Sequence, residues 1–179
     1  MRAPTIPDTE AERLEALASY AVLDTDPEAA FDALARLAAQ ILDVPVTLVS
    51  IVDANRQWFK SRQGLDATQT PRDVSFCGHV VAAGESMLVV DAMQDERFFD
   101  NPLVVGEPGV IFYLGGPLKT PEGHVLGTLC AIDHKPRQVS PAQQDMLETL
   151  AEQTMALLEL RRRTRLLEAQ QREIDVHRR

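Results

Sequence analysis

The chain has 179 residues, of which 45% are hydrophobic and 25% charged, so it is long enough for one globular domain and an additional helix. Its formal net charge of −9 argues against a nucleic-acid partner, because such a partner requires a basic face. No apolar run approaches the roughly 20 residues of a membrane-spanning helix, and two cysteines far apart in the sequence favour the reducing cytoplasm over a disulfide-rich compartment.

Two helices are predicted before the first strand. Residues 9–20 carry apolar side chains at helical spacing. In the second helix, Thr25 or Asp26 is the expected N-cap, and Glu28 is expected to complete a capping box with Thr25. This helix should end near Asp43. Its apolar stripe comprises Phe31, Leu34, Leu37, Ala38 and Ile41.

A β-hairpin and a short helix follow. The β-branched run 46–52 and the run 57–62 are predicted to pair as antiparallel strands across a turn. Residues 63–73 are expected to form a loop. Ser75 is the predicted N-cap of a helix that Gly84 ends, which places the stretch SFCGHVV in the first turns of that helix.

The next segment returns to β-structure. A short strand is predicted over residues 87–92. Residues 95–109 contain too many Gly and Pro residues for a strand and too few periodic apolar residues for a long helix. Residues 110–120 and 124–133 flank a turn and are predicted to form a second hairpin.

The last predicted element is a helix that starts after Ser140, has Gln143 in the capping-box position and continues to the final residue. We divide the chain into a domain over 1–158 and a C-terminal linker helix over 159–179. A narrow heptad seam in this helix predicts a two-stranded coiled coil and hence a homodimer. The alternative is a solvated helix whose leucines rest on its own domain. The hydrophobic seam residues are Leu150, Leu157, Leu160, Leu167 and Ile174.

Four long stretches carry a family resemblance: ERLEALASYAVLDTDPEAAFDALARLAA, TPRDVSFCGHVV, LVVDAMQDERFFDNPLVVGEPGVIFYLGGPL and LGTLCAIDHKPR. They resemble the GAF domain, in the subgroup found at the N-terminus of bacterial sensor histidine kinases and diguanylate cyclases. The resemblance implies an α+β fold with a central antiparallel sheet, N- and C-terminal helices on one face and a small-molecule pocket on the other. It also implies dimerisation through the end helices and a signal passed along the C-terminal helix to an effector such as a kinase or cyclase.

Cys77 is the candidate reactive group. It falls in the first turn of a predicted helix, where the helix N-terminus stabilises a thiolate. His79 is a poor partner for it, since residues two apart on a helix do not face each other. Cys130 lies within a predicted strand, a usual place for a small buried residue, and is the other redox candidate. A thiol-dependent redox enzyme or redox sensor is therefore the alternative function.

Cofactor sites find little support in the sequence. A zinc site would need Cys77, His79, Cys130 and His134, whose spacings match no recognised zinc motif. Bilin-binding relatives typically have a cysteine followed directly by histidine, whereas Gly78 intervenes here. We expect no metal, bilin or haem, and no set of catalytic residues.

The resemblance places a ligand pocket between the short helix and the loop after it. The expected residues are mostly aromatic, with polar tips that suit a small ligand. The predicted pocket residues are Phe76, His79, Asp91, Phe98, Phe99, Asn101 and Tyr113. For each of them the alternative is an ordinary core or turn role. The sequence thus predicts a non-catalytic sensory module that signals through its C-terminal helix.

Overall fold

A computed structural model describes residues 1–178. Its centre is a six-stranded antiparallel sheet with the strand order β3-β2-β1-β6-β5-β4. Both predicted hairpins are present in it. The strands are β1 (Val46–Val52), β2 (Arg56–Gln63), β3 (Gln69–Pro71), β4 (Met87–Val89), β5 (Phe112–Lys119) and β6 (Val125–Asp133).

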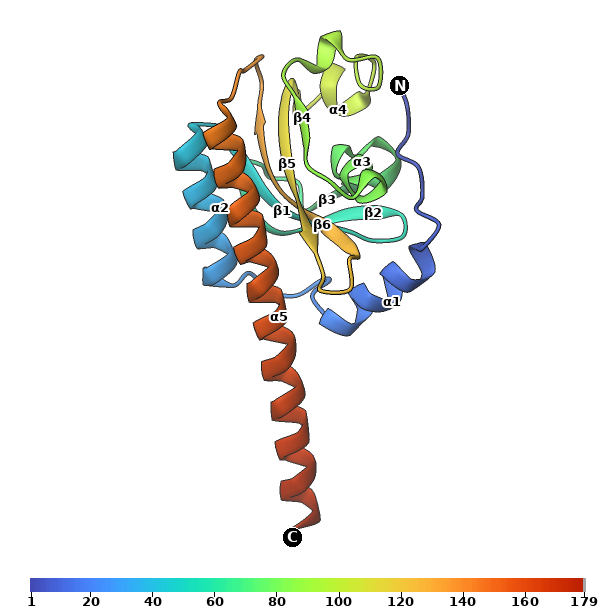
Figure 1. Cartoon of the computed structure of the whole chain (residues 1–179), viewed down its shortest axis with the longest axis vertical. Coiled ribbons are helices and arrows are strands. Elements are labelled where there is room, and N and C mark those ends of the chain that lie inside the picture. Colours follow the sequence, from blue (N-terminus) through green and yellow to red (C-terminus); the bar gives the residue numbers. More distant parts are fainter. Residues whose placement is uncertain (179) are drawn as a thin grey trace.

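Helices cover both faces of the sheet (Figure 1). On one face α2 contacts β1 and β2, while α5 contacts β5 and β6; on the other, α3 contacts β1, β5 and β6. Shorter elements lie on the α3 side, and α1 lies across one end of the sheet. The helices are α1 (Glu10–Tyr20), α2 (Ala29–Leu42), α3 (Phe76–Ala83), α4 (Pro102–Val105) and α5 (Pro141–His177), with 3-10 turns η1 (Arg72–Val74) and η2 (Ala92–Gln94).

The two faces of the sheet have separate apolar cores. Because successive side chains of a strand point to opposite faces, Val49 and Leu129 pack toward α2 and α5, whereas Leu48 and Cys130 pack toward α3. Every residue of β1 is therefore buried. This is why the run 46–52 is uniformly apolar or small and lacks a polar face.

The start of α2 differs from the prediction. The helix begins at Ala29, and the N-cap residue Glu28 makes no capping hydrogen bond through its side chain. The capping box with Thr25 was wrong because both side chains have other partners. The Lys60 ammonium donates a hydrogen bond to the Thr25 hydroxyl at 2.8 Å and forms an ion pair with the Glu28 carboxylate at 2.5 Å. Leu37, predicted in the core stripe, is 42% exposed; the buried residues of α2 are Phe31, Ala35, Ala38 and Leu42.

Three other segments allow the predicted element boundaries to be compared with the observed ones. Residues 63–73, expected as loop, include β3 and η1. The strand predicted over 87–92 ends at Val89, because Asp91 turns the chain by capping η2 through the Met93 amide. The predicted cap of α3 is confirmed: the Gly78 amide donates to Ser75 Oγ at 3.0 Å.

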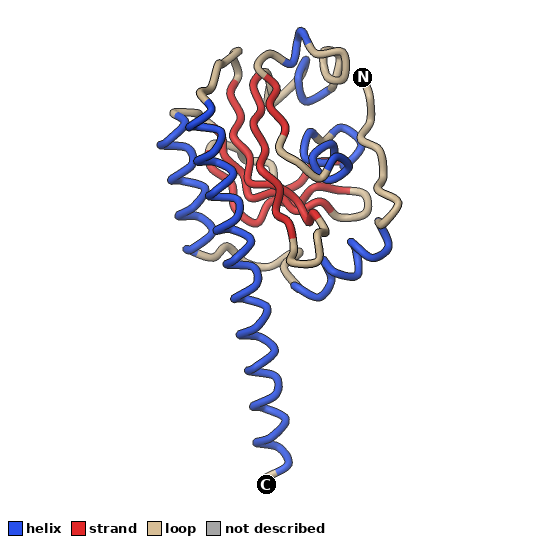
Figure 2. Tube along the Cα trace, in the orientation of Figure 1, coloured by secondary structure: helices blue, strands red, loops and turns tan. Residues whose placement is uncertain are grey.

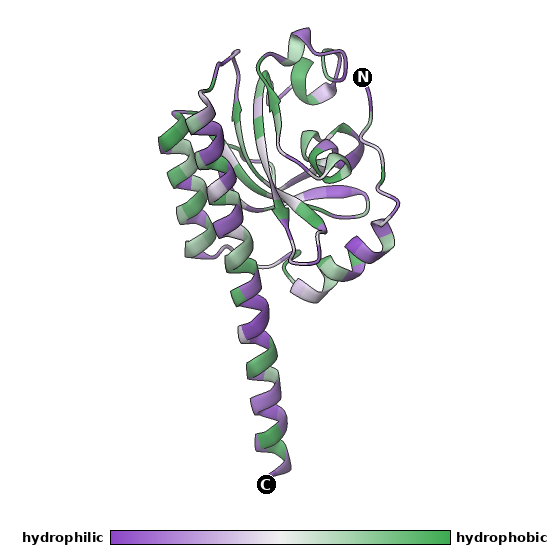
Figure 3. Ribbon diagram, in the orientation of Figure 1, coloured by the Kyte–Doolittle hydropathy of each residue, from purple (hydrophilic) through white to green (hydrophobic). Residues whose placement is uncertain are grey.

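Beyond residue 162 every described residue of α5 is exposed, and the helix projects from the body of the domain on its own (Figure 2). Its surface alternates between polar bands and isolated apolar ones (Figure 3). Leu160 and Leu167 are 60% and 65% exposed, whereas Leu150 and Leu157 are partly buried against the domain's own core. No helix within residues 1–178 combines the length and apolar character that crossing a membrane requires.

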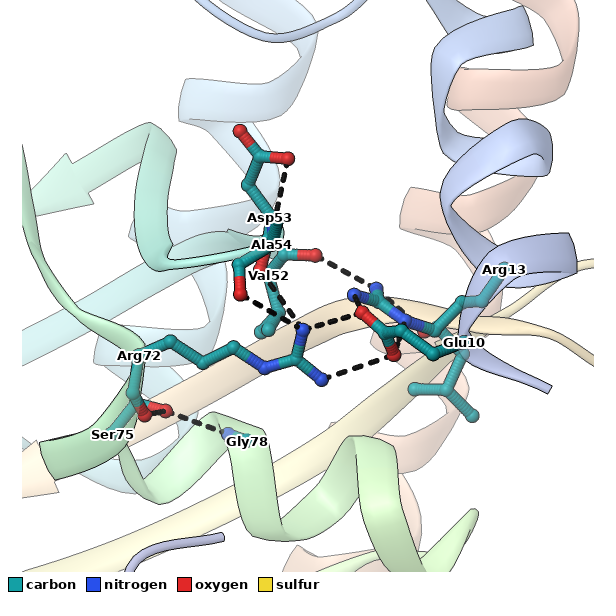
Figure 4. Close-up of polar contacts among 9 residues, drawn as sticks. Glu10, Arg13, Val52, Asp53, Ala54, Arg72, Ser75 and Gly78 are labelled. Atoms are coloured by element: carbon teal, nitrogen blue, oxygen red, sulfur yellow. Dashed lines mark hydrogen bonds and ion pairs between the residues drawn. The ribbon is translucent and has the colours of Figure 1, made fainter. Parts of the chain in front are cut away.

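Two buried arginines hold α1 against the end of the sheet (Figure 4). Arg13 and Arg72, only 2% and 3% exposed, both donate to the Glu10 carboxylate at 2.5–3.2 Å. Arg13 also donates to the Val52 carbonyl at 2.7 Å, and Arg72 to the Asp53 carbonyl at 3.1 Å. One carboxylate thus bridges two buried cations and links α1 to the β1–β2 turn and to η1.

The extended N-terminal segment crosses the outside of α3. Gly78 has no side chain, and a Cβ there would lie 2.7 Å from Pro4. The backbone of Arg2 bonds to the Arg97 carbonyl and receives a hydrogen bond from His79 Nε2. The glycine between Cys77 and His79 therefore makes room for the N-terminal segment.

Candidate ligand cavity

A cavity of about 320 Å³ lies on the α3 face of the sheet. Strands β1, β2, β5 and β6 form its floor, α3 forms one wall, and the segments 64–67 and 103–108 flank its mouth. Its volume is at the lower end of the range of small-molecule sites. The lining residues that matter below are Gln57, Asp66, Thr70, Phe76, Cys77, Leu103, Glu107, Tyr113 and Cys130.

Two thiols and a phenol meet at the inner end of this cavity. The Tyr113 hydroxyl donates to Cys77 Sγ at 3.2 Å. Cys77 Sγ is also 3.1 Å from Thr128 Oγ1. Cys130 lies beside Cys77, and both are free thiols. The inner wall is thus polar but densely hydrogen-bonded within the protein.

The position of the Tyr113 ring depends on the glycine two residues later in β5. The ring lies over Gly115, and a Cβ there would be 2.2 Å from the Tyr113 hydroxyl oxygen. Phe76 contacts the same ring with centroids 5.2 Å apart and stacks on Phe98 at 4.0 Å. The aromatic residues of α3 and of the following loop therefore fix the tyrosine hydroxyl against the Cys77 sulfur.

The two thiols differ in acidity. Burial alone would raise the pKa of Cys77, but hydrogen bonds, chiefly from Cys130, Thr128 and Tyr113, outweigh burial and lower it to about 6. The pKa of Cys130 moves well upward, because its neighbour Cys77 and its own burial both disfavour a second negative charge. Cys77 is therefore the more acidic of the two thiols.

A second polar chain crosses the floor between β1 and β3. Gln57 Nε2 donates to Thr70 Oγ1 at 2.6 Å, and the Ser50 hydroxyl donates to Gln57 Oε1 at 3.2 Å. Both polar ends of the Gln57 amide thus already have protein partners. One N–H of the Gln57 amide and the Thr70 hydroxyl remain as donors that a ligand could reach.

The structure brings together some of the predicted pocket residues and separates others. Phe76, Tyr113, Cys77 and Cys130 line the cavity, and Phe98 is fully buried behind Phe76. This places the two redox candidates beside two of the predicted pocket aromatics, Phe76 and Tyr113, in one site.

The remaining predicted pocket residues lie elsewhere. His79 borders a separate surface hollow, because the N-terminal segment covers its side of α3. Burial lowers its pKa. Phe99 is 48% exposed, next to the buried Phe98. Asp91 and Asn101 accept backbone amides as the caps of η2 and α4.

The mouth residues were missed by the sequence reading. Asp66 and Glu107 stand 41 positions apart, in segments that carry ordinary loop signals. Leu103 follows the Asn101 cap and turns toward the cavity from α4. The alternation of β1 and β2 could have indicated which of their side chains share the cavity face, but nothing local shows that the two loops converge.

On the opposite face of the sheet, the strand that forms the cavity floor is tied to α5. The Lys60 ammonium on β2 contacts the Glu28 carboxylate at 2.5 Å and the Asp26 carbonyl at 2.6 Å. Arg161 of α5 donates to the same Glu28 oxygen at 2.8 Å. Burial would raise the pKa of Glu28, but hydrogen bonds and charges from Lys60 and Arg161 lower it. We call Lys60, Glu28 and Arg161 the clasp.

The clasp lies where α5 leaves the domain. Phe59, the residue before Lys60, lines the cavity, so adjacent residues of β2 contact the cavity and the clasp. Nearby, Tyr20 donates to the Glu159 carboxylate, and Arg162 lies over the Tyr20 ring at 4.5 Å. The exit of α5 is therefore held by α1, by the loop before α2 and by β2.

Comparison with known proteins identifies this architecture. The GAF domain family model matches residues 26–158. A cyclic di-GMP phosphodiesterase from Pseudomonas aeruginosa is 38% identical over 169 residues, which are 94% of this chain and 29% of that protein. The GAF domain of a phosphoenolpyruvate-protein phosphotransferase from Coxiella burnetii has a TM-score of 0.65 at 18% identity, covering 86% of this chain and 95% of its own.

An enzyme shares the fold as well. A free methionine-R-sulfoxide reductase from Thermoplasma acidophilum has a TM-score of 0.58 at 14% identity, covering 71% of this chain and 87% of its own. At such identities the solved structures show the fold alone. An antiparallel sheet with helices on one face and a lined cavity on the other is the GAF-like α+β fold, and the chain belongs to the GAF domain family. It spans 29% of the length of its phosphodiesterase relative.

Proposed function

We propose that this chain is a non-catalytic regulatory GAF module that converts occupancy of its cavity into a change in α5. The observation that carries the proposal is the continuity of β2, which lines the cavity through Phe59 and holds the clasp through Lys60. The effector would be joined to or contacted by α5; a histidine kinase, a diguanylate cyclase or, as in the relative, a cyclic di-GMP phosphodiesterase fits this role.

The mechanism requires two arrangements of the domain. A ligand shifts their equilibrium only if it binds one better than the other. Glu28 offers a discrete change, because one carboxylate bridges a cation on β2 and a cation on α5. A shift of β2 that moved Lys60 would move the Glu28 carboxylate and so change its ion pair with Arg161. The segment of α5 around Arg161 would then be released from the domain or would rotate. In a dimer paired along the exposed seam, such a rotation would reach the effector.

The coupling can be tested without knowing the ligand. Leu103→Trp should fill the cavity from its mouth and imitate an occupant. We expect it to change amide hydrogen exchange over residues 157–163 of α5 by roughly threefold, because the stability of this local unit would shift. Val105→Trp is the matched control: Val105 lies on the same short helix and is 64% exposed, so exchange in α5 should stay as in the parent chain.

The clasp supplies a second arm of this experiment. Adding Glu28→Gln to Leu103→Trp should abolish the response of α5, whereas adding Asp26→Asn should leave it intact, because the Asp26 side chain is exposed and only its carbonyl meets Lys60. Unchanged exchange in the Leu103→Trp variant, or a response that survives Glu28→Gln, would contradict the proposed coupling.

A redox sensor is the second candidate function, favoured by the two thiols at the cavity floor. The Cys77 thiolate would attack hydrogen peroxide to give a sulfenic acid and hydroxide. The Cys130 thiol would then condense with that sulfenic acid, forming a disulfide and releasing water. The cavity gives a small oxidant access to Cys77.

The pH dependence of Cys77 alkylation tests this candidate. With iodoacetamide, the rate should rise through a midpoint near the lowered pKa of about 6. Tyr113→Phe removes one donor to the thiolate and should raise that midpoint by about one pH unit. Cys130→Ser should leave the alkylation site in place, and Cys77→Ser should remove it. A midpoint near that of a free thiol in the parent chain would rule against the redox function.

A further inference from the structure

The charge of the cavity is one-sided. Among residues 1–178, those that line it include the carboxylates of Asp66 and Glu107 but no lysine, arginine or histidine. Both acids stand at the mouth, on the loop after β2 and on the segment after α4. Arg62, near the end of β2, donates to the Leu65 and Asp66 carbonyls of that loop, but its side chain is not part of the lining. An anionic ligand would therefore enter past two negative charges.

The interior offers no compensation for an anion. A phosphate or sulfonate taken out of water needs a cation or several free donors, and without them its burial is unfavourable. The Tyr113 hydroxyl and one N–H of the Gln57 amide are already used, by Cys77 and Thr70, so within residues 1–178 the floor keeps few free donors and no cation. The rest of the lining is aromatic and aliphatic.

We propose that the cavity binds an uncharged or cationic, largely apolar small molecule and rejects anionic nucleotides. Such a ligand would place its rings or alkyl groups against the lining residues Phe76, Leu103 and Tyr113. Any amine or hydroxyl would point outward to Asp66 and Glu107. This inference deepens the proposed function by naming the ligand class of the same cavity. It also separates the module from the cyclic dinucleotide chemistry of its phosphodiesterase relative.

Two fluorescent probes of the same ring system test the charge argument. N-phenylnaphthylamine is uncharged, and anilinonaphthalenesulfonate carries one added sulfonate. We expect the neutral probe to bind the full chain at least about tenfold more tightly, since the sulfonate meets like charge and lacks a cation. Leu103→Trp should weaken the neutral probe by roughly tenfold or more because it occupies the mouth, and Val105→Trp should not.

A charge-reversed mouth separates the effect of charge from the bulk of the sulfonate. Asp66→Lys together with Glu107→Lys should tighten the sulfonate probe roughly five- to tenfold and leave the neutral probe unchanged. Both side chains are exposed, so the double variant should fold. Cyclic GMP should not displace the neutral probe from the parent chain.

Specific outcomes would overturn this inference. They are equal affinities for the two probes, displacement of the neutral probe by cyclic GMP, and an affinity for the neutral probe that Leu103→Trp does not change. None of these readouts involves α5. If the cavity binds the neutral probe but Leu103→Trp leaves hydrogen exchange in α5 unchanged, the proposed function is refuted. The inference about the ligand class would still stand.

Discussion

Replacing Glu10 with glutamine is expected to lower the free energy of unfolding by about 3 kcal/mol at neutral pH. Glutamine keeps the shape but removes the charge that Arg13 and Arg72 share. Both arginines are almost fully buried and would lose their counter-ion in a place that water does not reach. Urea-induced unfolding followed by circular dichroism measures the change. Glu12→Gln, an exposed acid on the same helix, should alter stability by less than about 0.5 kcal/mol.

The same substitution should change the acid sensitivity of the fold. Burial would raise the pKa of Glu10, but hydrogen bonds and charges from Arg13 and Arg72 outweigh it and lower the pKa from 4.5 to about 2. A carboxyl whose folded-state pKa is depressed stabilises the fold above its unfolded pKa, and this contribution is lost as the pH falls from about 4.5 to 2. The Glu10→Gln chain should therefore lose less stability over that window. A parallel decline in both chains would contradict the bridging role of Glu10.

The Leu167→Glu variant is expected to convert a dimer into a monomer at micromolar concentration. Leu167 belongs to the predicted seam, is 65% exposed on the single chain and lies beyond the domain body. In a coiled coil it would pack between helices, and a pair of glutamates there would bury two like charges. Sedimentation equilibrium of the full chain measures the result.

Leu166 is the matched control for the seam. It is the adjacent leucine, 59% exposed, one position off the heptad pattern and so on the outer face of the helix. Leu166→Glu should leave the dimer intact. If both variants dissociate equally, or if Leu167→Glu stays dimeric, the seam is not the dimer interface, and α5 is a solvated helix as in the alternative reading.

The fold was largely predictable because its signals are local. The Ser75 and Ser140 caps, the αL glycine at Gly84 and the two hairpins are written into neighbouring residues, and all are present. The capping box of α2 was wrong for a non-local reason. Thr25 and Glu28 are residue types that can cap a helix, but both side chains bind Lys60, which lies 32 positions after Glu28. The ammonium of Lys60 is buried and therefore requires polar partners.

The candidate site was only half predictable. Phe76 and Cys77 could be placed from the cap at Ser75, because the helix phase then directs them inward. The environment of His79 could not be predicted, since its partner Arg2 is 77 positions away in an N-terminal segment without a periodic pattern. Likewise, the acids at the mouth become neighbours only when two loops converge. Side chains of one helix or strand can be read from sequence; contacts between loops cannot.

The anchoring of α1 bears on where the folding unit begins. The family match starts at residue 26, yet Arg72 and Glu159 find partners in Glu10 and Tyr20 upstream of that point. A chain trimmed to the family boundary would keep every strand and leave Arg72 facing the sheet end without its carboxylate. Residues 1–25 are thus an integral part of this domain, and a minimal autonomous fragment has to start before Glu10.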